Sequence, residues 1–516
     1  MDRREFLKSL ALAATGVYTH GLALPPGSQA RPQANPSFHP DVELELTARP
    51  AQHEIFPGSP TKTWSYTAKL LKGRTGTLEP SGSYLGPSIR LRSGDKVRVH
   101  FRNELPEPTI VHWHGLAVPA LMDGHPRLVV PNGAQYLYEF EVQARAGHYW
   151  YHPHPDDRTG PQTYRGLAGL LFVHDQEESA LRLPSGEHEI PLVIQDRTFG
   201  AGRQLTYLTG PMDAMNGFLG DQILVNGVPD KQLNLGTGSY RLRLLNGSNS
   251  RVYKLAWSNG LPFTLIGTDG GLLERPVKKP YLVLAPAERA DVILDLSGHG
   301  LGSSFELRSL SFPAPQMMMG RGMGRGMGRG MMGGGSALQQ GSEFKVLRVL
   351  IHRKERSRFR LPARLSRPGF LRLQGAENAD QPRIFPLSFG RMQWFLNDST
   401  FQMEAAKENE TFKAGGLYAL GFRNESMGMM QMAHPMHLHG GQFQVLKRTP
   451  AAEDHAPLAS LREGLMDAGW KDTVLVLPGE EVLLLMKFPG FKGLFLYHCH
   501  ILEHEDMGMM RNYRLI

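Results

Sequence analysis

Near its C-terminal end the chain reads His498-Cys499-His500-Ile501-Leu502-Glu503-His504-Glu505-Asp506-Met507-Gly508-Met509-Met510. Cys499 is the only cysteine, so an internal disulfide is excluded and its thiolate is free to act as a soft metal ligand. Residues 494–497 before it are apolar and aromatic, which is typical of a buried strand. Because side chains alternate between the two faces of a strand, we expect Cys499 to face one way and His498 and His500 the other.

These residue types suit copper. One thiolate, imidazoles and a weak thioether form the ligand set of a blue-copper electron-transfer site. The alternatives are a structural zinc site and a buried thiol with incidental histidines. Zinc accepts cysteine and histidine, but it leaves the Met509/Met510 pair and the histidine pairs upstream unexplained. If the strand continues through His500, one short peptide serves two metal centres.

Four His-x-His pairs occur in the chain: His112/His114, His152/His154, His437/His439 and His498/His500. A spacing of two places both members of a pair on one face of a strand, where they can bind one site. Eight imidazoles suit copper better than calcium or magnesium, which prefer oxygen ligands. Two pairs lie early in the chain and two lie late, so we expect the cluster at the interface of these two parts.

A three-fold repeat is also visible. Residues 95–103, 239–246 and 417–424 each read as an alternating strand that ends in Asn, and residues 147–154 resemble residues 493–500. The middle repeat has strand patterns at 281–284 and 291–294 but lacks a His-x-His pair. It is expected to be a structural spacer.

Length and composition favour an all-β protein. At roughly 100–200 residues per domain, 516 residues indicate about three domains. Gly 58 and Pro 37, with few helical patterns, are typical of a turn-rich β fold. The net charge of +8 is partly local, in Arg321, Arg325 and Arg329 and in the basic stretch 345–367, which reads as an interdomain segment. No aromatic-basic module accompanies it, so nucleic acid is not an expected partner.

The N-terminus resembles an export signal. Arg3 and Arg4 precede Phe6-Leu7-Lys8 and a short, weakly apolar run at 10–17, as in twin-arginine signals; the alternative is a chance Arg-Arg pair. Cleavage is expected after Ala23 or Ala30. The twin-arginine machinery is then a partner, and the location is the periplasm or the cell exterior. No segment is apolar enough for stable membrane insertion.

Four motifs resemble the copper signatures of multicopper oxidases: His112-Trp113-His114-Gly115, His152-Pro153-His154, His434-Pro435-Met436-His437-Leu438-His439 and residues 498–509. The resemblance implies three cupredoxin-like Greek-key β-sandwich domains, four copper ions and reduction of O2 to water. It also implies that His434, Cys499 and His504 hold type 1 copper, with Met509 axial. By the same resemblance, His112 and His437 hold type 2 copper, and the type 3 pair is held by His114, His152, His154, His439, His498 and His500. We expect Pro435 to break the strand alternation, so that His434 faces away from His437 and His439.

The expected domains are 40–178, with half of the trinuclear site, 186–355, which is structural and includes the Met/Gly/Arg-rich segment 317–335, and 360–516, with type 1 copper and the other half of that site. A signal peptide at 1–30 precedes them. Oxygen reduction consumes protons, and Asp123 and Glu505 match acidic residues that deliver protons in similar bacterial enzymes. The alternative for both is a hydrogen bond to a ligand histidine.

The electron donor is predicted from methionines, whose thioethers suit Cu(I). They are Met317, Met318, Met319, Met323, Met327, Met331 and Met332, and Met427, Met429, Met430 and Met432 near the third motif. The chain here resembles copper-tolerance oxidases. The alternative for the first group is a Gly-rich loop with incidental methionines, or an Arg-Gly segment that touches nucleic acid.

The sequence therefore predicts an exported, monomeric multicopper oxidase that oxidises Cu(I), phenolic laccase substrates or both. The alternatives are a general laccase and a periplasmic copper-binding protein without turnover. Nitrite reduction would need fewer type 3 ligands than are present, and an electron carrier would need the type 1 set alone.

Overall fold

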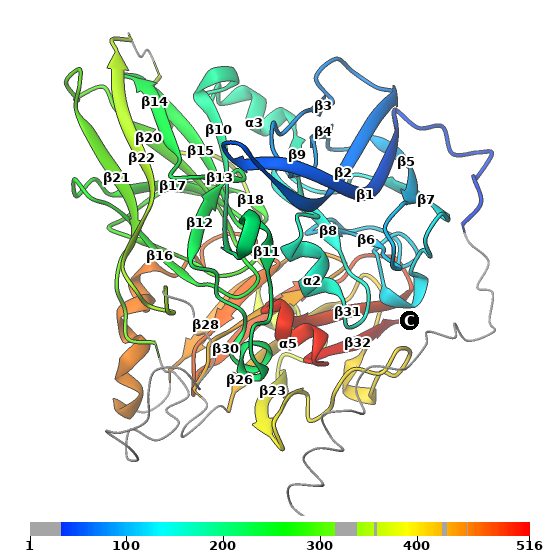
Figure 1. The fold of residues 1–516 in the computed structure, drawn as a ribbon. Helices are drawn as coiled ribbons and strands as arrows, with labels where there is room; N and C mark the ends of the chain where they lie inside the picture. Colours follow the sequence, from blue (N-terminus) through cyan, green and yellow to red (C-terminus); the bar gives the residue numbers. More distant parts are fainter. Residues whose placement is uncertain (1–31, 315–337, 356–358, 426–430, 451–452) are drawn as a thin grey trace, which may run out of the picture. The chain divides into compact units, whose positions relative to one another are not determined.

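The computed structural model describes residues 32–314, 338–355, 359–425, 431–450 and 453–516, and residues 34–516 form one compact unit. Strands dominate the described residues and form three successive pairs of sheets, coloured blue to cyan, green, and yellow to red in Figure 1. The prediction of an all-β fold is confirmed. Within these ranges, every helix is too short or too polar to cross a bilayer.

The first pair has the strand orders β2-β1-β5-β7 and β3-β4-β9-β8-β6. Alternating apolar residues such as Leu44 and Phe101 fill the core between its two sheets, together with Tyr138. The elements are β1 (Val42–Phe56), β2 (Ser59–Lys72), β3 (Leu78–Glu79), β4 (Ser88–Arg92), β5 (Lys96–Asn103), β6 (Val111–His114), η1 (Pro126–Leu128), β7 (Gln135–Glu141), β8 (Gly147–Pro153), α2 (Thr159–Tyr164), β9 (Gly169–His174) and α3 (Gln176–Ala180).

The second pair has the orders β13-β12-β10-β15-β20-β17-β18, with β11 on β10, and β14-β22-β21-β16-β19. Its elements are η2 (Gly186–His188), β10 (Glu189–Phe199), η3 (Ala201–Arg203), β11 (Leu205–Thr206), α4 (Pro211–Asn216), β12 (Gln222–Val225), β13 (Val228–Pro229), β14 (Gln232–Gly236), β15 (Ser239–Asn246), β16 (Tyr253–Trp257), β17 (Phe263–Thr268), β18 (Gly271–Lys279), β19 (Leu282–Leu284), β20 (Arg289–Asp295), β21 (Ser304–Ser309) and β22 (Phe344–Arg353). The interpretation of 345–367 as an interdomain segment is wrong for its first part. Residues 345–353 lie within β22, where Val346, Val349 and Ile351 are buried between β14 and β21.

The third pair has the orders β24-β23-β26-β30-β28 and β25-β32-β31-β27-β29. Its elements are η4 (Leu373–Gly375), β23 (Arg383–Gly390), β24 (Gln393–Leu396), η5 (Glu408–Glu410), β25 (Thr411–Phe412), β26 (Leu417–Asn424), β27 (His434–Leu438), β28 (Phe443–Thr449), η6 (Glu453–Gly464), β29 (Thr473–Val476), β30 (Glu481–Lys487), β31 (Gly493–Cys499), α5 (Leu502–Asp506) and β32 (Met510–Leu515).

The same pairing recurs in all three pairs, which confirms the three-fold repeat. One sheet of each contains a parallel strand pair followed by an antiparallel neighbour: β1-β5-β7, β10-β15-β20 and β23-β26-β30. The other contains β4-β9-β8-β6, β14-β22-β21-β16 or β25-β32-β31-β27. We call the three pairs of sheets the first, middle and third repeats. The exact domain boundaries stay a prediction.

The Asn that ends each repeated strand has the same structural role. Asn103, Asn246 and Asn424 are buried, and each side-chain amide donates to two main-chain carbonyls, one in the loop directly after the strand and one further along the chain. Buried carbonyls need such partners, so the sequence repeat reflects a repeated hydrogen-bonded corner.

Candidate metal centres

Four strands bring the histidine pairs together. In the first repeat β6 pairs with β8, which places His112 opposite His152, and in the third repeat β27 pairs with β31, which places His437 opposite His498. All eight histidines of the four pairs are buried. Nε2 of His112 lies 3.4 Å from Nε2 of His437, so the cluster lies between the first and third repeats, as predicted.

His112 and His437 face each other with unprotonated nitrogens. Nδ1 of His112 lies 2.6 Å from the carbonyl oxygen of Asp123, and Nδ1 of His437 lies 2.7 Å from that of Asp472. A carbonyl only accepts, so each Nδ1 carries the proton and each Nε2 presents a lone pair. Two lone pairs 3.4 Å apart repel, and a cation between them turns the repulsion into two ligand bonds.

His154, His439 and His498 form a second group. Nε2 of His498 lies 3.2 Å from Nε2 of His154 and 3.2 Å from Nε2 of His439. Nδ1 of His439 donates to the Asp123 carboxylate at 2.8 Å, and Nδ1 of His498 lies 3.0 Å from the carbonyl oxygen of Cys499. The Nε2 atoms of His439 and His498 are therefore free for a metal ion.

The third group contains His114, His152 and His500. Nδ1 of His152 donates to the carbonyl of Pro153 at 2.9 Å, and its Nε2 lies 3.4 Å from Nδ1 of His114. The His500 ring lies 5.2 Å from that of His114 and 5.3 Å from that of His152, between ring centroids. Neither nitrogen of His500 has a hydrogen-bond partner among the described residues, as expected for a buried imidazole that binds a metal.

Cys499 lies on the opposite face of β31, as predicted, and forms a fourth group. Its Sγ lies 3.5 Å from Nδ1 of His434 and 3.8 Å from Nδ1 of His504. Nε2 of His504 donates to the carbonyl of Met215 at 2.9 Å, which leaves its Nδ1 as the metal-facing atom. Met509 is buried in the same apolar cluster as Cys499, and its carbonyl accepts from the Cys499 amide at 3.1 Å.

The expected break at Pro435 is wrong. β27 pairs regularly with β29 from His434 through His437. Because residues three apart in a strand lie on opposite faces, the spacing alone turns His434 toward Cys499 and His437 toward the other histidines. Pro435 fits because its carbonyl accepts from the His500 amide at 2.6 Å, a contact that needs no N–H of its own.

Burial disfavours the charged form of His152, His154 and His504. It lowers the pKa of His152 to about 4 and the pKa of His154 and His504 to about 3. Burial raises the pKa of the Cys499 thiol, so the thiolate needs a nearby cation to form. The donors are thus unprotonated nitrogens and a sulfur that loses its proton to a metal, a set that fits copper.

Both predicted acidic residues contact the histidine groups. The Asp123 carboxylate accepts from His439, and burial raises the pKa of this carboxyl well above its usual value. Oε2 of Glu505 lies 3.0 Å from Nδ1 of His498, and its Oε1 lies 3.6 Å from Nε2 of His154. Burial alone would raise the pKa of Glu505, but His154 and His498 hold it below its usual value. One acid is thus placed to hold a proton and the other to stay ionised.

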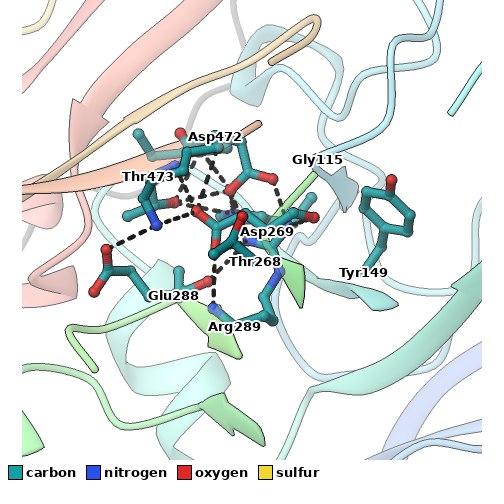
Figure 2. Close-up of polar contacts among 12 residues, drawn as sticks. Gly115, Tyr149, Thr268, Asp269, Glu288, Arg289, Asp472 and Thr473 are labelled. Atoms are coloured by element: carbon teal, nitrogen blue, oxygen red, sulfur yellow. Dashed lines mark hydrogen bonds and ion pairs between the residues drawn. The ribbon is translucent and has the colours of Figure 1, made fainter. Parts of the chain in front are cut away.

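Sequence reasoning missed Asp472 and Arg289. Oδ1 of Asp472 lies 3.0 Å from Nε2 of His114, and Nη1 of Arg289, from the middle repeat, donates to the same oxygen at 2.6 Å (Figure 2). The pair Lys471-Asp472 directly before the apolar residues 474–477 was an available signal, because charges at the start of a buried strand need partners. Arg289 had no such signal, since its partner lies far along the chain.

Trp394 and Met215 were missed as well. The Trp394 ring lies 4.6 Å from that of His434 and 4.8 Å from that of His504, between centroids. Its indole N–H donates to the carbonyl of Met215 at 3.0 Å, the same oxygen that His504 uses. Met215 belongs to α4, so the middle repeat contacts this centre too.

Most of the predicted Cu(I)-binding methionines lie outside the described residues. They are Met317, Met318, Met319, Met323, Met327, Met331, Met332, Met427, Met429 and Met430. Met432 is described, and it is partly buried against the core of the third repeat.

Comparisons with known proteins agree with this geometry. Two family models described as multicopper oxidase match residues 61–178 and 376–515. Multicopper oxidase mco of Staphylococcus aureus is 32% identical over 457 residues, which cover 86% of this chain and 87% of that protein. Cell division protein FtsP of Xenorhabdus nematophila is 30% identical over an alignment of 522 residues, covering 99% and 97%. The crystal structure of the McoA multicopper oxidase from the hyperthermophile Aquifex aeolicus has a TM-score of 0.76 at 34% identity, covering 93% of this chain and 97% of that one. The chain therefore belongs to the multicopper oxidase family, whose members are oxidoreductases with type 1, type 2 and type 3 copper.

Proposed function

We propose that the four groups of ligands hold four copper ions. His434, Cys499 and His504, together with Met509, would hold type 1 copper, and His112 with His437 would hold type 2 copper. The type 3 pair would be held by two sets of three: His114, His152 and His500 in one, and His154, His439 and His498 in the other. When bound, this copper accepts electrons one at a time from a donor and passes four of them to O2, which leaves as two molecules of water.

The observation that carries the proposal is the set of facing lone pairs. In three places two imidazole nitrogens lie 3.2–3.4 Å apart while the other nitrogen of each ring donates its proton elsewhere: His112/His437, His439/His498 and His114/His152. Without a metal ion, nothing would compensate the repulsion between these buried nitrogen lone pairs. A soft or borderline cation removes it, and eight imidazoles around three facing pairs suit a trinuclear centre.

The protein supplies a covalent link and two acids. Cys499 is joined by peptide bonds to His498 and to His500, so the main chain connects the sulfur to both type 3 ligand sets. Reduction of O2 to water also consumes four protons. Asp123, with its raised pKa, can hold a proton beside His439, and the ionised Glu505 can receive one beside His498.

The donor side of the proposal rests on the methionines. We infer Cu(I) as one donor and phenolic laccase-type compounds as another, in an exported protein that serves copper tolerance. Thioethers suit Cu(I), and the run at 317–332 and Met432 provide them. The paired Arg3 and Arg4 support the twin-arginine route to the periplasm or the cell exterior.

The competing function is copper binding without turnover. One similar chain is named for cell division and not for an oxidase activity. The complete ligand set favours turnover, because sequestration does not require a thiolate placed between two trinuclear ligands.

Oxygen uptake by the copper-loaded protein tests the function. We expect one O2 consumed per four Cu(I) or per four one-electron oxidations of a phenol, and no uptake by the zinc-loaded protein. A copper-loaded protein that binds Cu(I) but consumes no oxygen with either donor is a binding protein, and the proposal then fails.

A further inference from the structure

We propose that Arg289, from the middle repeat, is a positioning residue for the trinuclear centre and acts through Asp472. The inference rests on the copper ligands proposed above. Neither residue is a proposed ligand, but Asp472 contacts two of the proposed ligands, His114 and His437, and Arg289 contacts Asp472.

The contacts form a chain across all three repeats. Both terminal nitrogens of Arg289 contact the two carboxylate oxygens of Asp472, with Nη1 2.6 Å from Oδ1 (Figure 2). Oδ1 of Asp472 lies 3.0 Å from Nε2 of His114 in the first repeat. The main-chain carbonyl of Asp472 accepts from Nδ1 of His437 at 2.7 Å. One residue of the third repeat therefore orients two histidines from opposite halves of the centre.

The tautomer of His114 depends on this carboxylate. Oδ1 of Asp472 is a hydrogen-bond acceptor, because it also accepts from Arg289. Nε2 of His114 therefore carries the proton, and Nδ1 of His114 faces Nε2 of His152. His114 thus presents Nδ1, whereas His112, His437 and His439 present Nε2. Both carboxylate oxygens of Asp472 accept from the Arg289 guanidinium, which fixes the orientation of the carboxylate toward His114.

Arg289 is itself fixed on every side. Its guanidinium donates to the carbonyls of Ala287 at 2.9 Å, Asp269 at 3.0 Å and His148 at 3.3 Å. Its amide donates to the Asp269 carboxylate at 2.8 Å. A side chain held this way defines the position of its partner to within a narrow range.

The surrounding charges support a role toward a cation. Lys471 pairs with Asp269 at 2.9 Å and with Glu288 at 3.0 Å, and all of these side chains are buried. With Arg289 and Asp472 the cluster holds two cations and three carboxylates. Asp472 is the carboxylate of this cluster that contacts imidazoles proposed to hold copper, so a cation bound by those imidazoles would lie on the side of Asp472.

Gly115 provides independent support. It follows His114 directly and has a φ of +89°. A Cβ at this position would lie 2.5 Å from Oδ2 of Asp472 and 3.0 Å from Nη2 of Arg289. The backbone beside His114 therefore leaves room for this ion pair and for no side chain of its own.

The test compares copper-loaded Arg289→Met and Arg289→Lys with the wild type. The matched control is Arg241→Met, which removes another buried guanidinium of the middle repeat, one paired with Asp291 at 2.6 Å and Glu178 at 2.7 Å rather than near a proposed ligand. The readouts are the type 2 electron paramagnetic resonance signal, the type 3 near-ultraviolet band, the type 1 blue band, copper retained against a chelator, and thermal stability of the copper-free protein.

We expect Arg289→Met to retain trinuclear copper roughly 10–100-fold less tightly and to alter the type 2 signal, while the type 1 band stays. Arg289→Lys keeps the charge but loses the two-point contact, so an intermediate effect is expected. Arg241→Met should lower stability and leave both copper signals intact.

A merely structural role predicts something else: Arg289→Met would lose copper-free stability as the control does, with trinuclear and type 1 signals unchanged or reduced equally. That result overturns the inference. If Arg289→Met does not fold, a wild-type trinuclear signal and copper retention in Arg289→Lys overturn it instead. A wild-type protein that binds no trinuclear copper would contradict the proposed function. If the wild type is loaded and active and the Arg289 variants keep wild-type copper signals and retention, only this inference is contradicted.

Discussion

At the scale of the residue, the hydrogen bond on one histidine nitrogen decides which nitrogen is free for copper. His112 and His437 donate Nδ1 to main-chain carbonyls, whereas His114 donates Nε2 to Asp472. Motif spacing predicted these residues as ligands but not the nitrogen that each would offer to a metal. That choice depends on acceptors that come from other segments of the chain.

Replacing Cys499 by serine tests the link between the two kinds of copper site. The hydroxyl is a poor ligand for type 1 copper, so we expect the blue band to disappear and phenol oxidation to fall at least about 100-fold. The type 2 signal should persist, because Cys499 faces away from that centre. Unchanged turnover in this variant would contradict the proposed electron entry.

At the scale of the element, the recurring Asn corners hold the loops that follow the repeated strands. Asn246 donates to the carbonyls of Arg251 and Leu284 and accepts from the amide of Ser248. Its burial means that water cannot replace these bonds in the folded state.

We therefore expect Asn246→Ala to lower the free energy of unfolding by about 2–3 kcal/mol, since it leaves buried main-chain groups unpaired. Urea unfolding of the copper-free protein measures the change. Asn234→Ala, at an exposed position in β14, is the control and should change little. Equal changes in the free energy of unfolding for the two substitutions would mean that the hydrogen bonds of Asn246 do not stabilise the fold.

The buried carboxylate of Glu178, in α3, predicts a pH dependence of stability. Burial alone would raise its pKa, but the hydrogen bond from His174 and the charges of Arg241 and Arg243 lower it below its ordinary value of 4.5. A lowered folded-state pKa means that the stabilisation is complete above about 4.5 and is lost as the pH falls through the folded-state pKa.

Glu178→Gln should therefore destabilise the copper-free protein by about 3 kcal/mol near neutral pH, because it leaves buried guanidinium groups short of a counter-charge. The difference from the wild type should shrink only below about pH 4.5. Unfolding midpoints measured across that range check it, with the exposed Glu187→Gln as the control. A stability difference between Glu178→Gln and the wild type that stays constant down to strongly acidic pH would show that Glu178 contributes through its packing and not through its charge.

The sequence was most informative about strands and least informative about contacts between repeats. Alternation predicted the opposite faces of Cys499 and His498, and the repeated strands ending in Asn103, Asn246 and Asn424 predicted the recurring sheets. Pro435 was misread because its ring suggested a break, although the odd spacing from His434 to His437 already turned the two histidines apart. Periodicity describes one element at a time, so it does not reveal which residue of another repeat an element meets.

At the scale of the whole molecule, the proposed copper ligands lie in the first and third repeats, and the middle repeat supplies contacts behind them. Arg289 reaches Asp472 across 183 positions of sequence, and the carbonyl of Met215 reaches His504 across 289. No local sequence pattern predicts contacts between residues so far apart in the chain. The middle repeat, expected to be a structural spacer, thus also contacts residues at both proposed copper centres.

The methionine-rich run gives a prediction about the donor. Deleting residues 317–332 should reduce kcat/KM for Cu(I) more than for a phenol, because thioethers capture Cu(I) and do little for an aromatic ring. Parallel oxygen-uptake assays with both donors measure the ratio. Equal losses, or none, would remove the support for Cu(I) as a donor and leave the oxidase itself unaffected.

The central claim is that facing lone pairs mark copper positions. Anomalous X-ray diffraction from crystals of the copper-loaded protein, collected on both sides of the copper absorption edge, tests it most directly. We predict one copper at the sulfur of Cys499 with His434 and His504, and three more among the eight paired histidines. Copper at the sulfur alone, or no copper between His112 and His437, would contradict the account.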